Sequence, residues 1–400
     1  MKSRVLAAAY FTGLAFGVTW GGSFLILQLY AYSLGANYLE VALLSALFSL
    51  TMGIFQPFWG ILSDTIKKRK LFIITNTLLS IPIFLSLTYP YVPWIIVGRM
   101  FWAAVVAAVP VILMTVTSEV VSARSKGKGL GGYNAATSFG YALGLLSSGF
   151  FFNLFGILMS FVIYSLLVLL SVFFYYFSVP EVKKPAEDTP TSDVEIPKSS
   201  SSLFSVVYER IILLKKGGPL TVVSFLVLLL TTAQGSVFGL LSIYLLIKGI
   251  PRSLIGLLFS VFSFIALPTS PLFGHLSDII GRKKVLILSA LMYILSSLMY
   301  YYLPPDPLFV FLAISINGSA FSALSASSSA YVADVTSDDL RGEAMGVING
   351  MSSFGWGFGP IIAGTITLYF GIESIFLVAL TAALFAGILT AAFLKESLKK

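Results

Sequence analysis

The chain has 400 residues, of which 57% are hydrophobic and 10% are charged. A water-soluble domain carries about 25% charged residues, and a mean hydropathy of +0.94 excludes a fold surrounded by water alone. The chain has no cysteine, which excludes disulfides, thiolate metal sites and cysteine nucleophiles. We therefore expect an integral membrane protein, with no cofactor and no bound metal.

Twelve apolar stretches are long enough to cross a bilayer, since a span needs about 20 mostly apolar residues. They cover approximately 6–33, 39–62, 71–89, 93–118, 130–152, 157–179, 219–247, 253–274, 285–303, 308–333, 343–370 and 372–394. Backbone polar groups must be satisfied within each span, so we expect helices. The first stretch is too long for a signal-peptide core, and we expect it to be retained.

The basic residues predict the orientation of these spans. With both termini inside, every Lys and Arg falls on the cytoplasmic side except Lys248, Arg252 and the intramembrane Arg99. Short cytoplasmic loops carry this excess of basic residues in membrane proteins. We expect a multi-pass protein of the cell membrane, in which the net charge of +8 faces anionic lipid headgroups rather than nucleic acid.

A polar segment separates the sixth and seventh spans. Residues 180–202 hold four prolines, five acidic residues and a run of four serines, a composition typical of a flexible linker. Residues 203–216 combine apolar residues with Glu209, Arg210, Lys215 and Lys216 and predict an amphipathic helix on the inner membrane surface. We therefore divide the chain into a six-helix bundle at 1–179, a cytoplasmic linker at 180–218 and a second six-helix bundle at 219–400.

The two halves repeat each other. Gly21, Gly35, Pro57, Gly60, Leu62, Ser63 and Asp64 recur 214 positions later, and Gly127, Gly131, Asn134, Gly140, Gly144 and Gly149 recur 215 positions later. Repeats of six spans have the same orientation in the membrane. The pattern predicts an all-α protein of two bundles related by a pseudo-two-fold axis along the membrane normal.

The loops after the second and eighth spans carry a shared motif. Residues 60–70 read GILSDTIKKRK, and residues 274–284 read GHLSDIIGRKK. Both resemble the G-x-L-[SA]-D-x-x-G-[RK]-[RK] signature of the major facilitator superfamily, although Lys67 replaces the second glycine in the first copy. The resemblance covers the chain outside the linker and implies a twelve-helix transporter similar to the drug and solute exporters of that family.

Acidic and basic residues near this motif also recur. Glu119 precedes Lys126 by seven residues, and Asp334 precedes Arg341 by the same distance. We expect Asp64, Glu119 and Lys126 to form one cytoplasmic cluster, and Asp278, Asp334 and Arg341, beside Arg282, to form the other. In the family this region is thought to stabilise one access state, so we predict a gating role. The alternative is a set of solvated loop charges, each worth under about 1 kcal/mol.

Arg99 lies in the fourth span, about 9 Å from its outer end by helical rise. Intramembrane charges are costly and mark functional sites. Arg99 resembles the arginine of the family's R-x-x-x-G motif, which is linked to proton coupling, but Ala103 stands at the glycine position. The alternatives are snorkelling or a stabilising pair with Glu40. Asn37-x-x-Glu40 also fits a helix capping box, which we favour for Glu40 over a coupling role.

Two further features receive structural interpretations. His275 is the only histidine and occupies a variable position of the signature, so we assign it no role. Glycines four apart, as at Gly140 and Gly144 or Gly355 and Gly359, permit close helix packing. Gly355-x-x-x-Gly359-Pro360 resembles the family's antiporter motif, which belongs in the fifth span, where Leu145 replaces the proline.

The resemblance implies a central cavity lined by spans 1, 4, 7 and 10, with additions from spans 5 and 11. The candidates are Trp20, Gln28, Arg99, Trp102, Asn134, Tyr141, Gln234, Asn317, Asn349 and Trp356. Interhelical packing and hydrogen bonding is the alternative for each. Together they predict an aromatic and neutral-polar cavity with one positive charge, which suits amphipathic or weakly anionic organic solutes better than dications.

These features predict a secondary transporter that works as a monomer by alternating access. No phosphate-binding G-x-x-x-x-G-K-[ST] loop occurs, so an ion or solute gradient would drive it. We favour proton-coupled efflux of a small organic solute. A sugar or organic-acid importer on the same fold is the first alternative. A non-transporting membrane sensor or an intramembrane enzyme is the second, but an enzyme would need clustered acids, histidines or a nucleophile inside the spans.

Overall fold

The computed structural model describes residues 2–66, 68–121, 126–179, 218–337 and 340–397. Every regular element among them is an α-helix. The helices are α1 (Lys2–Ser33), α2 (Tyr38–Ile66), α3 (Arg69–Ser86), α4 (Val92–Val106), α5 (Ala108–Val120), α6 (Lys126–Ser178), α8 (Pro219–Phe238), α9 (Leu241–Ile247), α10 (Arg252–Ile280), α11 (Arg282–Tyr302), α12 (Pro307–Val335), α13 (Arg341–Phe370) and α14 (Ser374–Phe393). The linker and its expected amphipathic helix lie outside the described residues.

The helices account for the twelve spans. Ten described helical segments are long and apolar enough to cross a membrane, and one of them covers 127–178. That segment is a hairpin of two spans, because the backbone leaves helical geometry at Gly156 and the hydroxyls of Ser147 and Tyr164 meet over 3.1 Å on its two arms. Gly156 has a φ of 70°, which a residue with a Cβ rarely adopts. The 30-residue α13, richer in glycine and serine, is the twelfth span.

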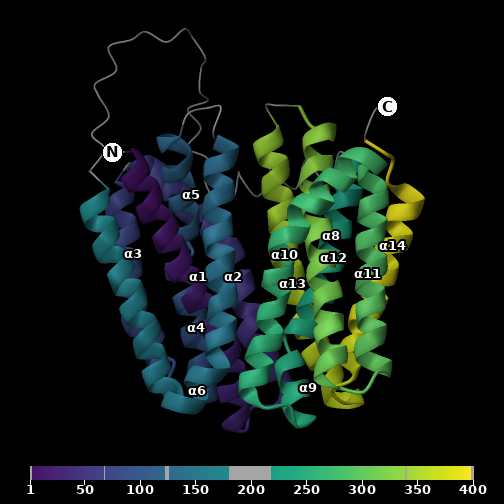
Figure 1. Ribbon diagram of the computed structural model, residues 1–400, viewed down its shortest axis with the longest axis horizontal. Coiled ribbons are helices and arrows are strands. Elements are labelled where there is room, and N and C mark those ends of the chain that lie inside the picture. Colours follow the sequence, from purple (N-terminus) through teal and green to yellow (C-terminus); the bar gives the residue numbers. More distant parts are fainter. Residues whose placement is uncertain (1, 67, 122–125, 180–217, 338–339, 398–400) are drawn as a thin grey trace.

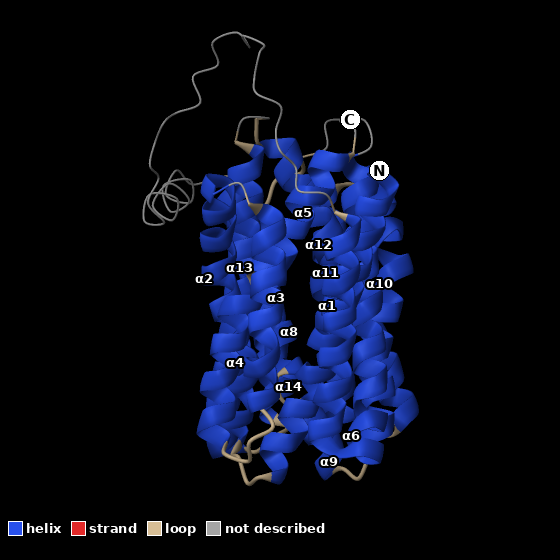
Figure 2. Cartoon of the chain, turned by 90° about the vertical axis from the view of Figure 1, so that its left-hand side faces the viewer, coloured by secondary structure: helices blue, strands red, loops and turns tan. Residues whose placement is uncertain are grey.

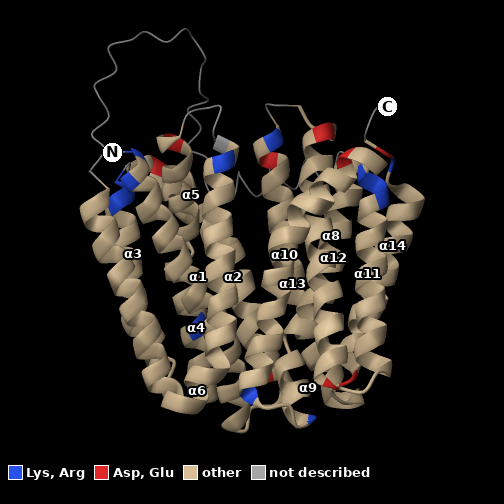
Figure 3. Ribbon diagram, in the orientation of Figure 1, with Lys and Arg blue, Asp and Glu red and all other residues tan. Residues whose placement is uncertain are grey.

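The helices form two groups side by side. Figure 1 shows α1–α6 on the left and α8–α14 on the right, and Figure 2, turned by 90° about the vertical axis, shows the same helices standing roughly upright. The chain termini lie at one end of the bundle, here called the terminal end, and the opposite end is the far end. Charged residues gather at these two ends (Figure 3), as expected for helices that cross lipid.

The same glycine contacts hold each half together. A Cβ on Gly144 of α6 would collide with the carbonyl oxygen of Val18 in α1. A Cβ on Gly359 of α13 would collide with the carbonyl oxygen of Thr232 in α8. The two pairs occupy equivalent repeat positions, so both halves use one backbone-to-backbone packing solution. This is the role that the glycine spacing predicts.

The halves contact each other toward the far end. Gly149 of α6 lies against the backbone of Arg252 in α10, and Gly364 of α13 lies against the backbone of Leu39 in α2. The Arg252 guanidinium also lies 4.9 Å from the centre of the Phe152 ring in the other half. These glycines are again repeat equivalents. The halves are therefore sealed at the far end, and α2, α6, α10 and α13 form the seam.

Candidate functional site: a central cavity and its gates

A cavity of about 880 Å³ lies between the two halves. Its walls come from α1, α2, α6, α8, α10, α12 and α13. The lining side chains are mainly aromatic or carry a neutral hydroxyl or amide. The aromatic ones are Trp20, Phe24, Phe48, Tyr141, Phe238, Phe262, Phe321 and Trp356, and the polar ones are Ser45, Ser49, Gln56, Asn134, Thr137, Ser138, Ser263, Ser270, Ser322, Ser325, Ser352 and Ser353. Among the described residues, no side chain that lines the cavity carries a formal charge.

The cavity faces the terminal end. Its lining includes Gly131 near the start of α6 and Gln56 and Ser270 in the second halves of α2 and α10. These positions lie toward the terminal end of their helices, whereas the seam around Gly149 and Gly364 closes the far end. The structure is open to one side of the bundle only, as one of the two states of alternating access requires.

The cavity follows the internal repeat. Phe24 and Phe238, Phe48 and Phe262, Ser49 and Ser263, and Gln56 and Ser270 are pairs 214 positions apart, whereas Thr137 and Ser352, Ser138 and Ser353, and Tyr141 and Trp356 are 215 apart. Each half therefore offers nearly the same wall to a solute. The exceptions include α12, whose Phe321 and Ser322 line the cavity while α4 contributes no lining residue, and Trp20 and Asn134, whose repeat equivalents lie outside the lining.

Four of the predicted cavity residues line it: Trp20, Asn134, Tyr141 and Trp356. The other six lie outside the lining, which corrects the prediction. Gln28 hydrogen-bonds to the other half beyond the cavity, Trp102 packs on Phe48 and Phe84, and Asn317 donates to the hydroxyl of Ser296 over 3.2 Å. Gln234 is fully buried with no hydrogen-bond partner among the described groups, and Asn349 is exposed. Trp102, Gln234 and Asn317 are thus buried within their own bundles, whereas Gln28 reaches across to the other half.

Arg99, the sixth, is buried in the first half with 1% of its surface exposed. Its Nη1 donates to the carbonyl oxygen of Ser23 over 3.2 Å, and its Cζ lies 4.9 Å from the centre of the Phe48 ring. No ion pair joins Arg99 to Glu40 among the described contacts. The cavity therefore touches Phe48, and the positive charge lies behind that ring.

The prediction missed most of the hydroxyl groups. In α2, the lining residues Ser45, Ser49, Met52 and Gln56 stand four, three and four apart, which places them on one helix face. A polar stripe with this period along an otherwise apolar span was the signal for them. Serine alone is a weak marker, because in a membrane helix it commonly bonds to its own backbone.

Gln28 closes the far end of the cavity. Its Nε2 donates to the carbonyl oxygen of Phe238 over 3.3 Å, and its Oε1 accepts from the hydroxyl of Ser242 over 2.6 Å. Both partners belong to the other half.

Further out, Lys248 donates to Glu373 over 2.8 Å, and this hydrogen bond raises the pKa of the lysine above its usual value.

At the terminal end, Arg69 joins two predicted residues of the first cluster. It pairs with Asp64 over 2.8 Å and with Glu119. These three residues belong to α2, α3 and α5, so the cluster ties together three helices of one half. The side chain of Lys126 lies outside the described residues. Arg69 stands five positions after the signature aspartate and was not among the predicted site residues.

The second cluster is built around Arg282. This arginine pairs with Asp278, lies 3.2 Å from Asp334, and donates to the Ser277 hydroxyl over 2.6 Å. Glu396 accepts from the backbone N–H of Arg282 over 2.8 Å, and its carboxylate occupies the space that a Cβ on Gly281 would need. Arg341, predicted as a member of this cluster, donates to the carbonyl oxygen of Ala333.

Glu40 forms the predicted capping box. Its carboxylate accepts from the backbone N–H of Asn37 over 2.8 Å, and the Asn37 side chain accepts from the N–H of Glu40 over 2.9 Å. His275 is exposed on α10.

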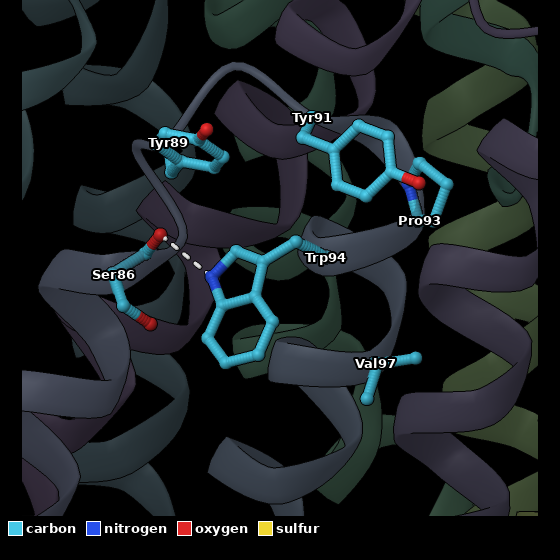
Figure 4. A pocket seen from close by; sticks show the side chains of 6 residues that line it. All are labelled: Ser86, Tyr89, Tyr91, Pro93, Trp94 and Val97. Atoms are coloured by element: carbon cyan, nitrogen blue, oxygen red, sulfur yellow. Dashed lines mark hydrogen bonds between the residues drawn. The ribbon is translucent and has the colours of Figure 1, made fainter.

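A shallow depression at the α3–α4 loop has a different character. Ser86, Tyr89, Tyr91, Pro93, Trp94 and Val97 line it, and Trp94 donates to the carbonyl oxygen of Ser86 over 3.0 Å (Figure 4). Exposed Tyr and Trp at a helix end are typical of the belt at a membrane surface. We assign this depression to lipid contact.

Two repeated helix bundles around a cavity that opens to one end define a membrane transporter of the alternating-access class. The chain belongs to the Major Facilitator Superfamily, whose family model matches residues 9–251 and 220–400. It is a transporter rather than an enzyme.

Individual relatives are similar over part or all of the chain. Multidrug resistance protein 2 of Bacillus subtilis (strain 168) is 34% identical over 41% of this chain and 40% of its own length, so the match spans well under half of that relative. An uncharacterized MFS-type transporter of the same organism, YuxJ, is 25% identical over 86% of this chain and 85% of its own. A structure of the nucleoside transporter NupG superposes with a TM-score of 0.82 at 14% identity, over 98% and 100% of the two chains.

Proposed function

We propose that this protein exports uncharged or weakly anionic amphipathic organic compounds across the cell membrane, acting as a monomer with its terminal end in the cytoplasm. The observation that carries this proposal is the cavity, whose described lining combines eight aromatic side chains with neutral hydroxyls and amides. Such walls bind flat apolar groups by contact and stacking, and a few neutral hydrogen bonds orient them. The relatives named multidrug resistance protein 2 and multi-drug resistance efflux pump PmrA support the export direction.

We further propose that efflux is driven by proton antiport and that the two terminal-end clusters take part in gating. In each cluster one arginine is shared by two carboxylates, so protonation of one acid would weaken the pairing and loosen the helix ends. Glu40 is held in the capping box. The remaining candidates for the proton-coupling step are Glu119 and water linked to Arg99.

The test is flux through purified protein in liposomes. A panel of radiolabelled compounds, made of flat aromatic alcohols, aromatic acids, sugars and nucleosides, would be measured with and without a pH gradient. We expect flux of the aromatic compounds, accelerated by a gradient that draws protons inward. Protein-dependent flux that ignores the pH gradient would refute antiport, and flux restricted to sugars or nucleosides would refute the substrate class.

The second candidate is uptake of a polyhydroxylated solute. One observation favours it: repeat-related hydroxyls from both halves line the cavity, as at Ser49 and Ser263. Structures of NupG and of a D-xylose-proton symporter, the latter with a TM-score of 0.75 at 16% identity, share the fold. Fold likeness alone does not assign a substrate. The same panel separates the candidates by substrate and by the direction of the driving gradient.

A further inference from the structure

Arg99 is a buried charge without an acidic partner among the described residues. It is 1% exposed, its Nε has no hydrogen-bond acceptor, and a single backbone carbonyl accepts from its Nη1. The ion pairs that the structure describes all lie near the helix ends. A guanidinium stays protonated even when buried. The first half therefore carries an uncompensated positive charge close to the cavity.

Phe48 connects this charge to the solute site. The ring lies 4.9 Å from Arg99 Cζ, and it also lines the cavity beside Trp20, whose ring centre is 5.8 Å away. An aromatic cavity would ordinarily attract organic cations through the electron-rich faces of its rings. Here Arg99 already makes a cation–π contact with Phe48. In a weakly polar interior, the positive charge of Arg99 also repels a cationic solute over several ångströms.

The second half has no matching charge. The positions that correspond to Arg99 in the repeat are Ala313 and Ile314, whichever offset is used. Phe262, the counterpart of Phe48, packs on the rings of Phe238 and Phe321. The walls of the cavity are thus alike in shape and unlike in electrostatic potential.

We propose that Arg99 is a specificity-determining residue, which makes the cavity prefer neutral and monoanionic aromatic solutes to organic cations of the same shape and turns an anionic group toward Phe48. The inference rests on the proposed function, since it assumes that the cavity binds aromatic solutes. It adds the residue that selects against cationic solutes and the part of the cavity toward which an anionic group turns.

Three naphthalene compounds of similar shape test this selection: naphthylethanol, naphthylacetate and naphthylethylammonium. Equilibrium dialysis against the full-length protein in nanodiscs gives their affinities at neutral pH. We expect naphthylacetate to bind at least about tenfold tighter than naphthylethylammonium, with the alcohol close to the acid. Arg99→Gln should bring the acid and the ammonium compound within about threefold of each other, whereas Arg99→Lys, which keeps the charge, should retain the preference.

The outcomes separate the inference from the proposal beneath it. If naphthylethanol fails to bind, the proposed aromatic substrate class falls, and the inference falls with it. If the alcohol binds but wild type takes the ammonium compound as well as the acid, the inference and the expected preference against cations are overturned, while transport of aromatic solutes stands. This outcome needs only the wild-type protein, so it can be read even where Arg99→Gln does not fold. A preference that survives unchanged in folded Arg99→Gln also overturns it.

Discussion

Gln28 and Ser242 occupy the same position in the two repeats, 214 residues apart, and they hydrogen-bond to each other over 2.6 Å. Their exposed fractions are 1% and 0%. Each lies four residues beyond a phenylalanine that lines the cavity, Phe24 in α1 and Phe238 before α9. The cavity is therefore closed at the far end by a bond between equivalent residues of the two halves, and this bond must break when that end opens.

Replacing Gln28 with leucine should shift the protein toward the state open at the far end. The variant keeps the bulk of the side chain but leaves the Ser242 hydroxyl and the Phe238 carbonyl buried without their partner in the closed state. A buried unpaired group costs about 1–3 kcal/mol, and water would satisfy both groups once the gate opens. The equilibrium should move by about tenfold.

The absence of cysteine makes this shift measurable. A single Ser148→Cys reporter, at a fully buried serine of the α6–α10 seam, should react faster with an impermeant maleimide from the far side when Gln28→Leu is added. Ser236→Ala is the matched control, because this buried hydroxyl bonds only within its own helix over 2.8 Å. Equal labelling in Gln28→Leu and the control would show that the bond does not hold the gate.

The repeat in the sequence predicts that Gln28 and Ser242 are equivalent, but not that they touch. Contact requires knowing which helix faces meet at the axis, and α1 is apolar all round, so its sequence does not mark one face. Arg99 illustrates the same limit: its depth follows from the span boundary, whereas its position behind Phe48 depends on the rotation of α4. The signature motif and the glycine spacing predicted the fold because they recur at equivalent positions. The glycines allow the same backbone-to-backbone contacts in both halves.

A second prediction compares two glycines of α13. A Cβ on Gly359 would collide with the backbone of α8, whereas a Cβ on Gly350 would meet nothing within 4 Å. Gly359→Ala should therefore destabilise the protein by about 1–3 kcal/mol through forced separation of the helices. Gly350→Ala should be neutral or slightly stabilising, since alanine favours helix by about 1 kcal/mol. Tryptophan fluorescence during thermal unfolding in detergent reports both, and similar melting temperatures would contradict the packing argument.

Arg282 should matter more for transport than for stability. The Arg282→Gln variant leaves Asp278 and Asp334 without their shared cation. Both acids are at least 31% exposed, and ion pairs with exposed acids contribute little to stability. We expect a small change in melting temperature and at least a severalfold loss in initial flux, if the cluster gates the terminal end. Lys284→Gln, two positions along on the exposed face of α11, is the control. Equal flux in the two variants would remove the gating role.

The far-end pair Lys248–Glu373 predicts how stability depends on pH. The hydrogen bond from Lys248 to Glu373 raises the pKa of the lysine above its usual 10.5, so the pair stabilises the folded protein below that pH and its contribution disappears as pH rises through the raised value. The difference in melting temperature between wild type and Lys248→Gln should be constant at pH values well below 10.5 and should shrink progressively as pH rises above 10.5. If the difference in melting temperature instead disappeared near neutral pH, the stabilisation would come from a group other than Lys248.

The capping box at Asn37 and Glu40 separates helix stability from proton coupling. Glutamine can take the place of glutamate in a capping box, so Glu40→Gln should keep the start of α2 intact while removing a titratable group. We expect flux, and its response to a pH gradient, to match wild type. Glu40→Ala should lose the reciprocal hydrogen bonds seen at 2.8 and 2.9 Å and about 0.5–1 kcal/mol of stability, again without altering the response to the gradient. If Glu40→Gln folded normally but no longer responded to the pH gradient, Glu40 would be a coupling residue. The lack of an ion pair between Glu40 and Arg99 in this structure would then describe only one step of the transport cycle.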